Sequence, residues 1–396
     1  MNSINNLFNP TNEHIILRDV VKKFTLEEIL PYATENNRNE FFDKEIFKKM
    51  GALGLLGITV DEKYGGSGMD AVSAVIAHEE IATHDPAVAL SYLAHTILCV
   101  NNIAVNANER QKRKLLPDLC SGKNIGAMGL SEAIAGTDIF AMKTNAKKNG
   151  NNYIVNGSKM WITNGVIDNN KRTCDVLYLY ARSGEKNLIS TFFIEKDTPG
   201  FYVGQNIKNK LGMRASATSE LIFDECHISV DNLIGKEGES TKNMMRNLQL
   251  ERITLAAISL GIARNCIRIM HNYAKERIAF GKSIINFGQI QQYIAESYSE
   301  YMACKTYVYN IANSININKS NIRIDSDSVK LISSKMAKKV ADNAIQVLGG
   351  NGYIDEYIVE RLWRDAKLLE IGGGTNEALQ KNIVKDLTKF ENLSWL

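Results

Sequence analysis

The sequence predicts an α+β protein in which a helical region, a β region and a second helical region follow one another. Apolar residues recur at spacings of three and four from about residue 12 to 125, and again from Ser240 to about residue 388. Between them the pattern changes to short alternating segments, and no βαβ alternation is found. A chain of 396 residues can form two or three domains. We therefore expect domains at residues 1–125, 126–238 and 239–396.

The first region is predicted to be helical from its apolar spacing and its few interruptions. Within Ile46–Leu56 and Val72–Ala82 the apolar side chains fall on one helix face. The glycine-rich segment Tyr64–Gly68 predicts a loop between helices. Only two prolines, Pro86 and Pro117, interrupt the later part of the region.

The β region is predicted from short alternating segments and from turn signals around them. Asn-Gly pairs favour tight hairpin turns, and they occur at Asn149-Gly150, Asn156-Gly157 and Asn164-Gly165. The region ends near Gly238. The segments that we expect to be strands are Tyr153–Asn156, Val176–Ala181, Ser190–Glu195 and Glu220–Phe223.

The third region is predicted to consist of long helices. Ser240 follows Gly235–Gly238 and has the side chain of a helix N-cap. The polar segment Asn318–Asn321 predicts a loop between two long helices. No internal repeat is evident.

Composition excludes several classes of function. The net charge of +3 gives no electrostatic footprint for nucleic acid. The six cysteines form no CxxC pair, which favours free thiols in a reducing compartment, and the six histidines show no metal-binding spacing. The sequence contains no run of about 18 apolar residues, so no membrane-spanning helix is expected. The N-terminus resembles neither a signal peptide nor an arginine-rich transit peptide, so a cytoplasmic bacterial protein is our first expectation.

One carboxylate interrupts an apolar helix face. The face that begins near Ser240 contains Glu251 as its only polar member, so this carboxylate is predicted to be buried. It is either paired with a buried arginine, such as Arg252, or a general base whose pKa is raised by its surroundings. The apolar members of the face are Met244, Leu248, Leu255, Ile258 and Ile262.

Two glycine clusters near the end of the chain, Gln346–Tyr353 and Trp363–Glu377, border helical segments. Such clusters let backbone N–H groups approach a ligand. Together the two segments resemble the C-terminal signature of the acyl-CoA dehydrogenase family of flavoproteins, and the resemblance extends over nearly the whole chain. It implies a helical N-terminal domain, a middle β-barrel domain and a C-terminal four-helix bundle. It also implies FAD as the cofactor.

The resemblance favours the interpretation of Glu251 as a catalytic base. Most members carry their base in a Tyr-Glu-Gly-Thr motif, and Gly373 occupies that glutamate position here. The isovaleryl-CoA and long-chain branches place the base in a Leu-Glu-Arg motif instead, which matches Leu250–Arg252. The missing carboxylate and the compensating one agree, so Glu251 is expected to be the catalytic base.

Several segments resemble the flavin-binding motifs of the family. Met128–Asp138 is similar to its flavin-binding strand and loop, with Ala133 and Thr137 in place of the usual proline and serine. Arg277–Gly281 is similar to Arg-x-x-Phe-Gly, whose arginine meets the flavin pyrophosphate. Gly288 stands where a glutamine is usual, so Gln289 is expected to supply that contact. The resemblance implies cofactor binding by Met128, Leu130, Ser131, Gly136, Thr137, Trp161, Ile162, Thr163, Arg277, Phe280, Gln289, Gln346, Gly349, Gly350, Thr375 and Glu377.

The expected substrate is a short branched-chain acyl-CoA of the isovaleryl type, as in leucine catabolism. Leu90–His95 resembles the Leu-Ser-Tyr-Gly-Ala-His of that branch, with Leu93 in place of glycine. Lys186-Asn187 and Lys242 also depart from the pattern of that branch. The residues expected to bind substrate are Thr137, Leu90, Ala94, Gln249, Arg252, Gly373 and Gly374.

The resemblance also implies partners. Electrons would leave through an electron-transfer flavoprotein, and the flavin site would be completed across the interface of at least a homodimer, usually within a tetramer. Because relatives also work in mitochondria, a matrix location is expected if the source is eukaryotic. The alternatives are a long-chain or other short-chain dehydrogenase, an acyl-CoA oxidase, and a non-catalytic flavin- or nucleic-acid-binding relative.

Overall fold

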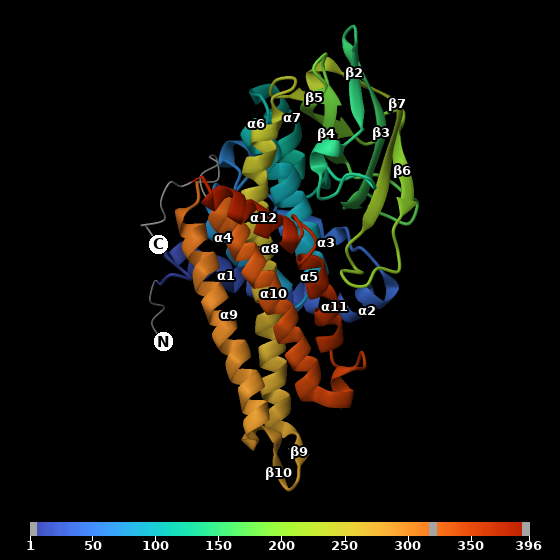
Figure 1. The fold of residues 1–396 in the computed structure, drawn as a ribbon. Coiled ribbons are helices and arrows are strands. Elements are labelled where there is room, and N and C mark those ends of the chain that lie inside the picture. Colours follow the sequence, from blue (N-terminus) through green and yellow to red (C-terminus); the bar gives the residue numbers. More distant parts are fainter. Residues whose placement is uncertain (1–5, 317–322, 390–396) are drawn as a thin grey trace.

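The computed structural model describes residues 6–316 and 323–389, and it has the predicted succession of helices, sheet and helices. Figure 1 shows the sheet at one end of the molecule, with the N-terminal helices beside long helices that extend to the opposite end. The predicted α+β class is therefore confirmed. The segment Asn318–Asn321, which we expected to be a loop, lies outside the described residues.

The N-terminal region contains seven α-helices among the described residues. The central one, α4, is buried along its whole length. The helix predicted within Ile46–Leu56 ends earlier than expected, at Ala52, because Gly54 adopts a left-handed φ of 73°. The helices are α1 (Asn12–Phe24), α2 (Leu30–Asn39), α3 (Glu45–Ala52), α4 (Ala71–Ala82), α5 (Pro86–Leu93), α6 (Asn101–Asn106) and α7 (Glu109–Cys120).

The middle region forms one eight-stranded sheet in the order β6-β7-β3-β2-β4-β5-β8, with β1 paired to β4. Its two halves, around β3 and β7 and around β4 and β5, enclose one shared apolar core. The sheet therefore folds over on itself, as expected for the β-barrel domain that the family resemblance implies. The strands are β1 (Gly126–Gly129), β2 (Asn145–Asn149), β3 (Asn152–Thr163), β4 (Val176–Ser183), β5 (Leu188–Glu195), β6 (Phe201–Asn206), β7 (Thr218–Ser229) and β8 (Leu233–Ile234).

The three Asn-Gly pairs play different parts in this sheet. Asn149-Gly150 forms the turn between β2 and β3, and Asn164-Gly165 follows the end of β3. The expected turn at Asn156-Gly157 is wrong, because this pair lies inside β3 at a register shift against β7. Gly157 has a φ of 136°, so it relieves an irregularity in the strand and does not reverse the chain.

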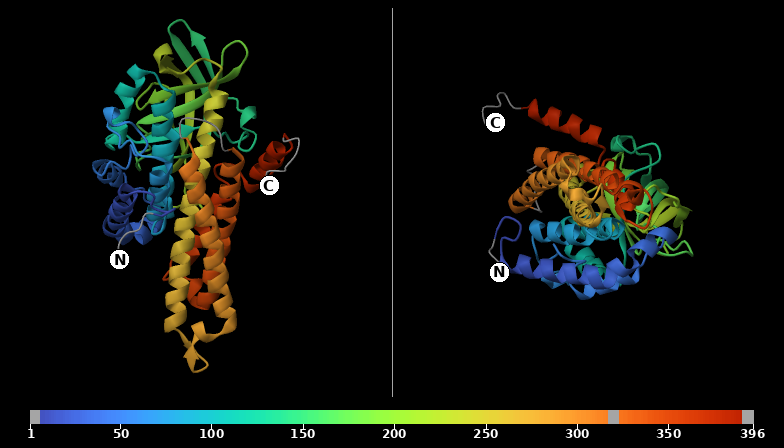
Figure 2. Two further views of the ribbon diagram at one scale, coloured as in Figure 1. Left: turned by 90° about the vertical axis from the view of Figure 1, so that its left-hand side faces the viewer. Right: turned by 90° about the horizontal axis from the view of Figure 1, so that it is seen from below.

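The C-terminal region is built on three long helices, α8 (Ser240–Glu276), α9 (Gly288–Ser314) and α10 (Arg323–Leu348). They pack against one another, and α11 (Val359–Leu369) and α12 (Asn376–Leu387) pack on α10. Figure 2 shows α12 directed away from the body of the bundle.

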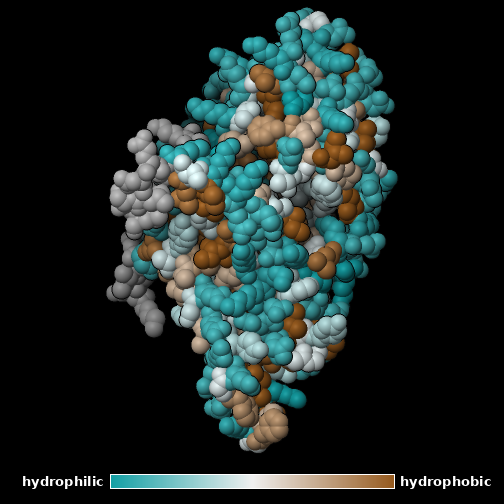
Figure 3. Space-filling model, in the orientation of Figure 1, coloured by the Kyte–Doolittle hydropathy of each residue, from teal (hydrophilic) through white to brown (hydrophobic). Residues whose placement is uncertain are grey.

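Two details of the C-terminal region differ from the sequence prediction. Ser240 is the first residue of α8, and Glu239 occupies the N-cap position without a side-chain cap. A small hairpin of β9 (Ile278–Ala279) and β10 (Lys282–Ser283) interrupts what we expected to be continuous helix. The hairpin turns at two residues with positive φ, of which Phe280 is 95% exposed. Apolar side chains gather at this tip in Figure 3.

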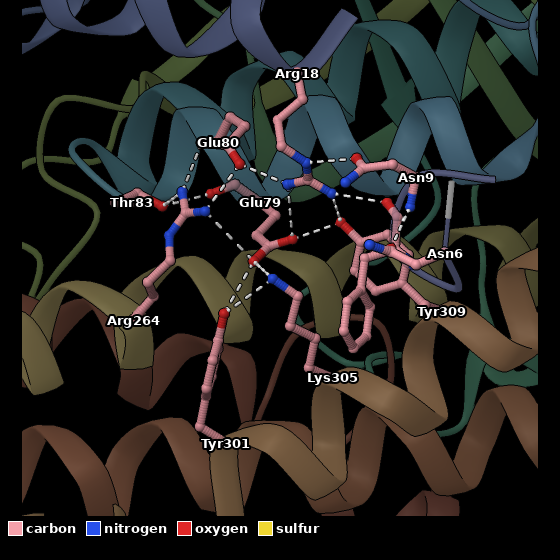
Figure 4. Close-up of polar contacts among 11 residues, drawn as sticks. Asn6, Asn9, Arg18, Glu79, Glu80, Thr83, Arg264, Tyr301, Lys305 and Tyr309 are labelled. Carbon is pink, nitrogen blue, oxygen red and sulfur yellow. Dashed lines mark hydrogen bonds and ion pairs between the residues drawn. The ribbon is translucent and has the colours of Figure 1, made fainter. Parts of the chain in front are cut away.

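The N-terminal helices are fixed to the bundle by close packing and by a buried ionic cluster. A Cβ on Gly261 of α8 would lie 2.6 Å from the Glu79 carbonyl oxygen, so only glycine permits α4 this close. Glu80 pairs with Arg18 of α1 at 2.6 Å and with Arg264 of α8 at 2.7 Å. Lys305 of α9 pairs with Glu79 at 2.9 Å. Figure 4 shows how this cluster joins four helices.

Two segments of the described chain are long and apolar enough to cross a membrane by length and composition, Pro86–Asn106 and Ser240–Glu276. Because 72% and 78% of their apolar windows are buried inside the protein, both match core helices. In the described residues no group of three or more His, Cys, Asp or Glu side chains could hold a metal ion. All six cysteines are free and buried.

Candidate active site

Glu251 lies on α8 with its carboxyl group buried and incompletely compensated. The residue is 7% exposed, and its Oε2 has no hydrogen-bond partner among the described residues. Burial raises the pKa of Glu251 to about 7, although the charges of Arg252 and Lys330 act to lower it. A carboxyl group with a pKa near working pH is suited to accepting a proton in a reaction. The environment of Glu251 therefore fits a general base.

A turn with two left-handed glycines lies beside this carboxyl group. Gly373 has a φ of 66° and Gly374 a φ of 100°. A Cβ on Gly373 would lie 3.5 Å from Oε1 of Glu251 and 2.3 Å from Cδ1 of Leu255. Position 373 and Glu251 thus approach the same space from two different backbones. Both the φ of Gly373 and the Leu255 side chain oppose a larger residue in this turn.

The carbonyl groups of this turn are held by side chains of α8 and α10. Arg252 Nε donates to the Gly373 carbonyl oxygen at 3.0 Å, and its Nη1 pairs with Asp327. Lys330 Nζ donates to the Gly374 carbonyl oxygen at 2.7 Å. The sequence left open a pairing of Arg252 with Glu251, but in the structure Arg252 pairs with Asp327. A substrate contact of Arg252 stays a prediction, since its guanidinium is engaged by the turn and by Asp327.

The segment Met128–Thr137 leaves β1 and is anchored against β3 by a buried ion pair. Lys159 Nζ donates to the Leu130 carbonyl oxygen at 3.0 Å and pairs with Glu132 at 2.9 Å. Burial acts to raise the pKa of Glu132, but Lys159 and two backbone N–H groups outweigh it and lower the pKa. The pair therefore stays charged and fixes the start of a loop whose far end, at Gly136 and Thr137, is exposed.

Next to this loop, β3 presents Trp161 in an unusual conformation. Trp161 has a φ of 60° and is 54% exposed, and the register of β3 against β7 shifts before Ile162. The Met160 N–H donates to the Ser131 carbonyl oxygen at 2.9 Å, which joins the two predicted flavin segments. Ile162 is buried and Thr163 is half-buried. A large side chain held at positive φ is uncommon and is typical of functional sites.

Helix α5 adjoins the end of β3. Asn164 Nδ2 donates to the Ser91 carbonyl oxygen at 2.8 Å and to the first carbonyl of β1 at 3.3 Å. Leu90 is half-buried beside this junction, and Ala94 is buried. Leu93 is 1% exposed and belongs to the main apolar core. The larger residue at position 93 therefore contributes to core packing.

The sheet end of the molecule gathers most of the predicted site residues. Helix α8 contacts α5 and β5 here, and the Glu251 charge acts, with burial, to raise the pKa of Tyr180 on β4. Thr375 caps α12 by accepting the Ala378 N–H at 3.2 Å. We use the name proximal group for the predicted site residues on these elements, which are Leu90, Ala94, Met128, Leu130, Ser131, Gly136, Thr137, Trp161, Ile162, Thr163, Gln249, Glu251, Arg252, Gly373, Gly374, Thr375 and Glu377.

The remaining predicted flavin residues lie at the opposite end of the bundle. Arg277 ends α8, about 39 Å along the helix axis from Glu251. Asn351 donates to the Tyr273 hydroxyl at 2.9 Å, which places the glycines after α10 near the last turns of α8. One chain therefore does not bring the two groups together. The distal group comprises Arg277, Phe280, Gln289, Gln346, Gly349 and Gly350.

Comparisons with known proteins match the whole described architecture. The family models "Acyl-CoA dehydrogenase, N-terminal domain", "middle domain" and "C-terminal domain" match residues 11–123, 127–226 and 241–388. The mitochondrial isovaleryl-CoA dehydrogenase of Pongo abelii is 43% identical and aligns over 91% of this chain and 85% of its own. The chain belongs to the acyl-CoA dehydrogenase family.

Two further proteins illustrate the range of similar acyl-CoA dehydrogenase relatives. The mitochondrial 2-methylacyl-CoA dehydrogenase of Solanum tuberosum is 40% identical over 94% of this chain and 90% of its own. Among solved structures, one described as the electron transferring flavoprotein of Acidaminococcus fermentans contains a chain with a TM-score of 0.92. That chain is 35% identical to the present one, and the match covers 97% of the present chain and 100% of the matched chain.

Acyl-CoA dehydrogenases are FAD-dependent flavoproteins and oxidoreductases. The residues present fit this cofactor. A Cβ on Gly136, Gly349 or Gly350 would meet no other atom within 4 Å, so these glycines border open space where a ligand can approach the backbone. The exposed ring of Trp161 offers a flat apolar surface, and the exposed guanidinium of Arg277 suits a pyrophosphate.

An open cavity of about 840 Å³ lies where β2 meets the ends of β4 and β5, and Glu251 is not part of its lining. It is bordered by β2, by the turn between β4 and β5, and by Glu237-Gly238. Its lining carries a net positive charge, since its basic side chains outnumber its two carboxylates; the charged residues are Lys147, Lys148, Arg182, Lys186, Glu185 and Glu237. Arg182 steadies the turn by donating to the Asn187 carbonyl oxygen at 2.6 Å. The departure at Lys186-Asn187 is thus part of this cavity.

Four residues of the site were not singled out from the sequence. Lys330 and Asp327 hold the glycine turn, and Lys159 and Glu132 hold the loop after β1. A lone lysine or aspartate on an otherwise mixed helix or strand resembles a surface residue. The only signal available was their position on element faces that the neighbouring apolar residues mark as buried.

Proposed function

We propose that this acyl-CoA dehydrogenase introduces an α,β double bond into a short branched-chain acyl-CoA of the isovaleryl type, with Glu251 as the base. The observation that carries the proposal is the buried, unpartnered Oε2 of Glu251 beside the vacant position 373. Glu251 would remove the α-proton of the thioester. Bound FAD supplies the acceptor for the hydride that leaves the β-carbon.

The residues around Glu251 suit the charge that develops in this reaction. Removal of an α-proton moves negative charge toward the thioester carbonyl oxygen, which needs hydrogen-bond donors in place beforehand. The backbone N–H of Gly373 or Gly374 is proposed as such a donor, since the turn lies beside the base. Trp161 and the loop at Thr137 would hold the cofactor and substrate against this point.

The cavity where β2 meets the ends of β4 and β5 supports a thioester of CoA as the substrate. We propose that the phosphates of CoA lie along Lys147, Lys148 and Lys186 of its lining. Lysine ammonium groups attract phosphate as point charges.

The separation of the proximal and distal groups supports an assembly of at least two copies. FAD would meet the proximal group of one copy and Arg277, Phe280, Gln289 and Gln346 of another. The exposed apolar side chains at the β9–β10 tip support contact with a second chain. We propose a homodimer or a homotetramer of paired dimers, which passes electrons to an electron-transfer flavoprotein, in the cytoplasm of a bacterium or the matrix of a mitochondrion.

The deciding experiment mixes the purified, flavin-loaded protein with acyl-CoA thioesters under anaerobic conditions. Isovaleryl-, isobutyryl-, 2-methylbutyryl-, butyryl- and palmitoyl-CoA form the panel, and bleaching of the yellow flavin measures reduction. Isovaleryl-CoA should bleach it fastest. Fastest bleaching by palmitoyl-CoA would favour a long-chain enzyme, and no bleaching by any thioester would favour a non-catalytic flavin protein. In a separate aerobic assay, oxygen consumption in place of transfer to the electron-transfer flavoprotein would identify an oxidase.

The cofactor and assembly are tested on the same preparation. Mass spectrometry of the released chromophore should find FAD, since Arg277 and the glycines after α10 suit a dinucleotide. Finding FMN, or no flavin after reconstitution, would contradict this part of the proposal. An Arg277→Ala variant should lose FAD affinity, and a monomer that binds FAD normally would contradict the shared site.

A further inference from the structure

Behind the glycine turn, α10 carries two buried charged residues to which the proposed reaction gives no role. Lys330 is 1% exposed and Asp327 is fully buried, and they lie three residues apart on the same helix face. Burial of a lysine and an aspartate is unfavourable unless both find charged or polar partners. Asp327 pairs with Arg252, which in turn holds the Gly373 carbonyl, and Lys330 donates to the Gly374 carbonyl.

These contacts determine how the peptide groups of the turn are directed. In a trans peptide the carbonyl oxygen and the N–H point in opposite directions. Because Arg252 holds the Gly373 carbonyl, the N–H of Gly374 must point away from Arg252. In the described residues, no backbone carbonyl receives the N–H of Gly373 or Gly374. The two held carbonyls thus direct the N–H groups of Gly374 and Thr375, and the Gly374 N–H is left for another acceptor.

We infer that Asp327 and Lys330 are positioning residues for the dehydrogenation, which hold the Gly373–Gly374 turn so that the Gly374 N–H faces the thioester. Lys330 acts directly on the Gly374 carbonyl, and Asp327 acts through Arg252. This inference rests on the proposed function, because it assigns a task to the turn only if the thioester reacts beside Glu251.

The same residues contribute to the electrostatic surroundings of Glu251. Arg252 and Lys330 act to lower its pKa, and Glu251 in turn acts to raise the pKa of Tyr180 on β4. Asp327 and Glu370 in turn act on Lys330. Loss of the Lys330 charge should therefore raise the pKa of Glu251 further. Because the base must be ionised, the rising limb of the activity–pH profile should move to higher pH.

The test compares Lys330→Met and Asp327→Asn with the matched control Lys339→Met. Lys339 lies on the same helix and is half-exposed, so its loss removes an equal charge away from the turn. Lys330→Met should lower kcat about 10- to 100-fold with little change in KM, since a small displacement at a reacting centre has effects of that size. Asp327→Asn should lower kcat about 10-fold. Lys330→Arg, which keeps the charge and a donor, should retain more activity than Lys330→Met.

A readout that needs no turnover separates this inference from the proposed function. Amide hydrogen exchange should become faster in the segment Ile371–Asn376 of the flavin-loaded Lys330→Met protein and stay unchanged in Lys339→Met. If Lys330→Met leaves this exchange, kcat per bound flavin and the pH profile as in the wild type, both residues are merely structural and the inference is overturned. An inactive wild type would remove the proposed function, while unchanged exchange would still contradict the positioning of the turn.

Discussion

Glu79 and Glu251 are both buried, and their surroundings give them opposite properties. Glu79 of α4 is fully buried and receives Lys305 Nζ at 2.9 Å and the Tyr309 hydroxyl at 2.5 Å. Burial acts to raise its pKa, but Lys305, Arg264 and Arg18 outweigh it and hold the pKa well below its usual range. Glu251 is almost equally buried, yet its pKa is raised to about 7.

The difference lies in compensation and not in burial. Glu79 is surrounded by cations and hydroxyl groups from three other helices, as Figure 4 shows. Near Glu251 the two closest cations, Arg252 and Lys330, are engaged by backbone carbonyls. A fully compensated carboxylate stays ionised and fixes helices together. An under-compensated one can exchange a proton near neutral pH, which is what a base requires.

The largest expected effect tests the catalytic role of Glu251. Glu251→Gln removes basicity from a nearly isosteric side chain, so turnover should fall by about 100- to 10,000-fold. FAD content and fold should be retained. Steady-state kinetics with the best acyl-CoA and flavin absorbance per chain measure both. Near-normal dehydrogenation by this variant would contradict the role of Glu251.

The second largest expected effect tests the contribution of Glu79 to stability. Glu79→Gln leaves Arg18, Arg264 and Lys305 with one carboxylate fewer in a buried cluster, so the free energy of unfolding should fall by about 3–5 kcal/mol. Thermal and urea unfolding measure the loss, with the exposed Glu45→Gln as the control. Activity per correctly folded chain should stay within a few-fold of the wild type. A stability equal to that of the control would show that the cluster contributes nothing.

The pH dependence of stability sharpens the comparison because its sign should differ between the two residues. The folded pKa of Glu251, about 7, exceeds its ordinary value of 4.5, so stability falls as pH rises between these values. Glu251→Gln should therefore gain up to about 3 kcal/mol over the wild type near pH 8 and little near pH 4. The contribution of Glu79, whose folded pKa is lowered, is present above about pH 4.5 and is lost as pH falls.

Urea titrations near pH 4 and near pH 8 measure how the stability of each variant, relative to the wild type, changes with pH. Glu79→Gln should be most harmful at the higher pH, where the wild-type carboxylate gives its full contribution. If the two variants show the same dependence on pH, the contrast in compensation is wrong.

The sequence predicted Glu251 better than Glu79 for a physical reason. Glu251 interrupts an apolar stripe and stands in a motif, so both local pattern and resemblance indicated it. Glu79 and Glu80 form an acidic pair within α4, a pattern typical of a solvated face. Their burial depends on Arg18, Arg264 and Lys305, which lie far along the chain on other helices.

The fold was predictable to the level of its regions, and less so in its local details. The periodicities gave the helical and β segments, but the β9–β10 hairpin was missed because helical spacing resumes directly after it. The supports of the glycine turn were missed because Arg252 and Gly373 are separated by 121 positions. Local patterns indicate which residues are buried, and they do not indicate which distant backbone group a buried side chain will meet.

The smallest expected effect concerns the relocation of the base. The space beside Oε1 of Glu251 is also reached from position 373, so a glutamate there should partly replace the lost base. Two obstacles are visible: the left-handed φ of Gly373, and Cδ1 of Leu255 at 2.3 Å from the new Cβ. Glu251→Gly with Gly373→Glu should regain measurable activity over Glu251→Gly, and adding Leu255→Ala should increase the gain.

This rescue should reach only about 10-fold over the matched control, Glu251→Gly with Leu255→Ala, because a displaced carboxylate retains a small part of the original rate. Gly373→Glu alone should weaken the binding of branched acyl-CoA, since its side chain would occupy space beside the base. Activity is measured across the acyl-CoA panel, with FAD content checked for each variant. If neither rescue variant exceeds its control on any thioester while FAD and fold are intact, position 373 and Glu251 do not address the same α-carbon. Glu251 would then act from a geometry that the vacant glycine position does not share.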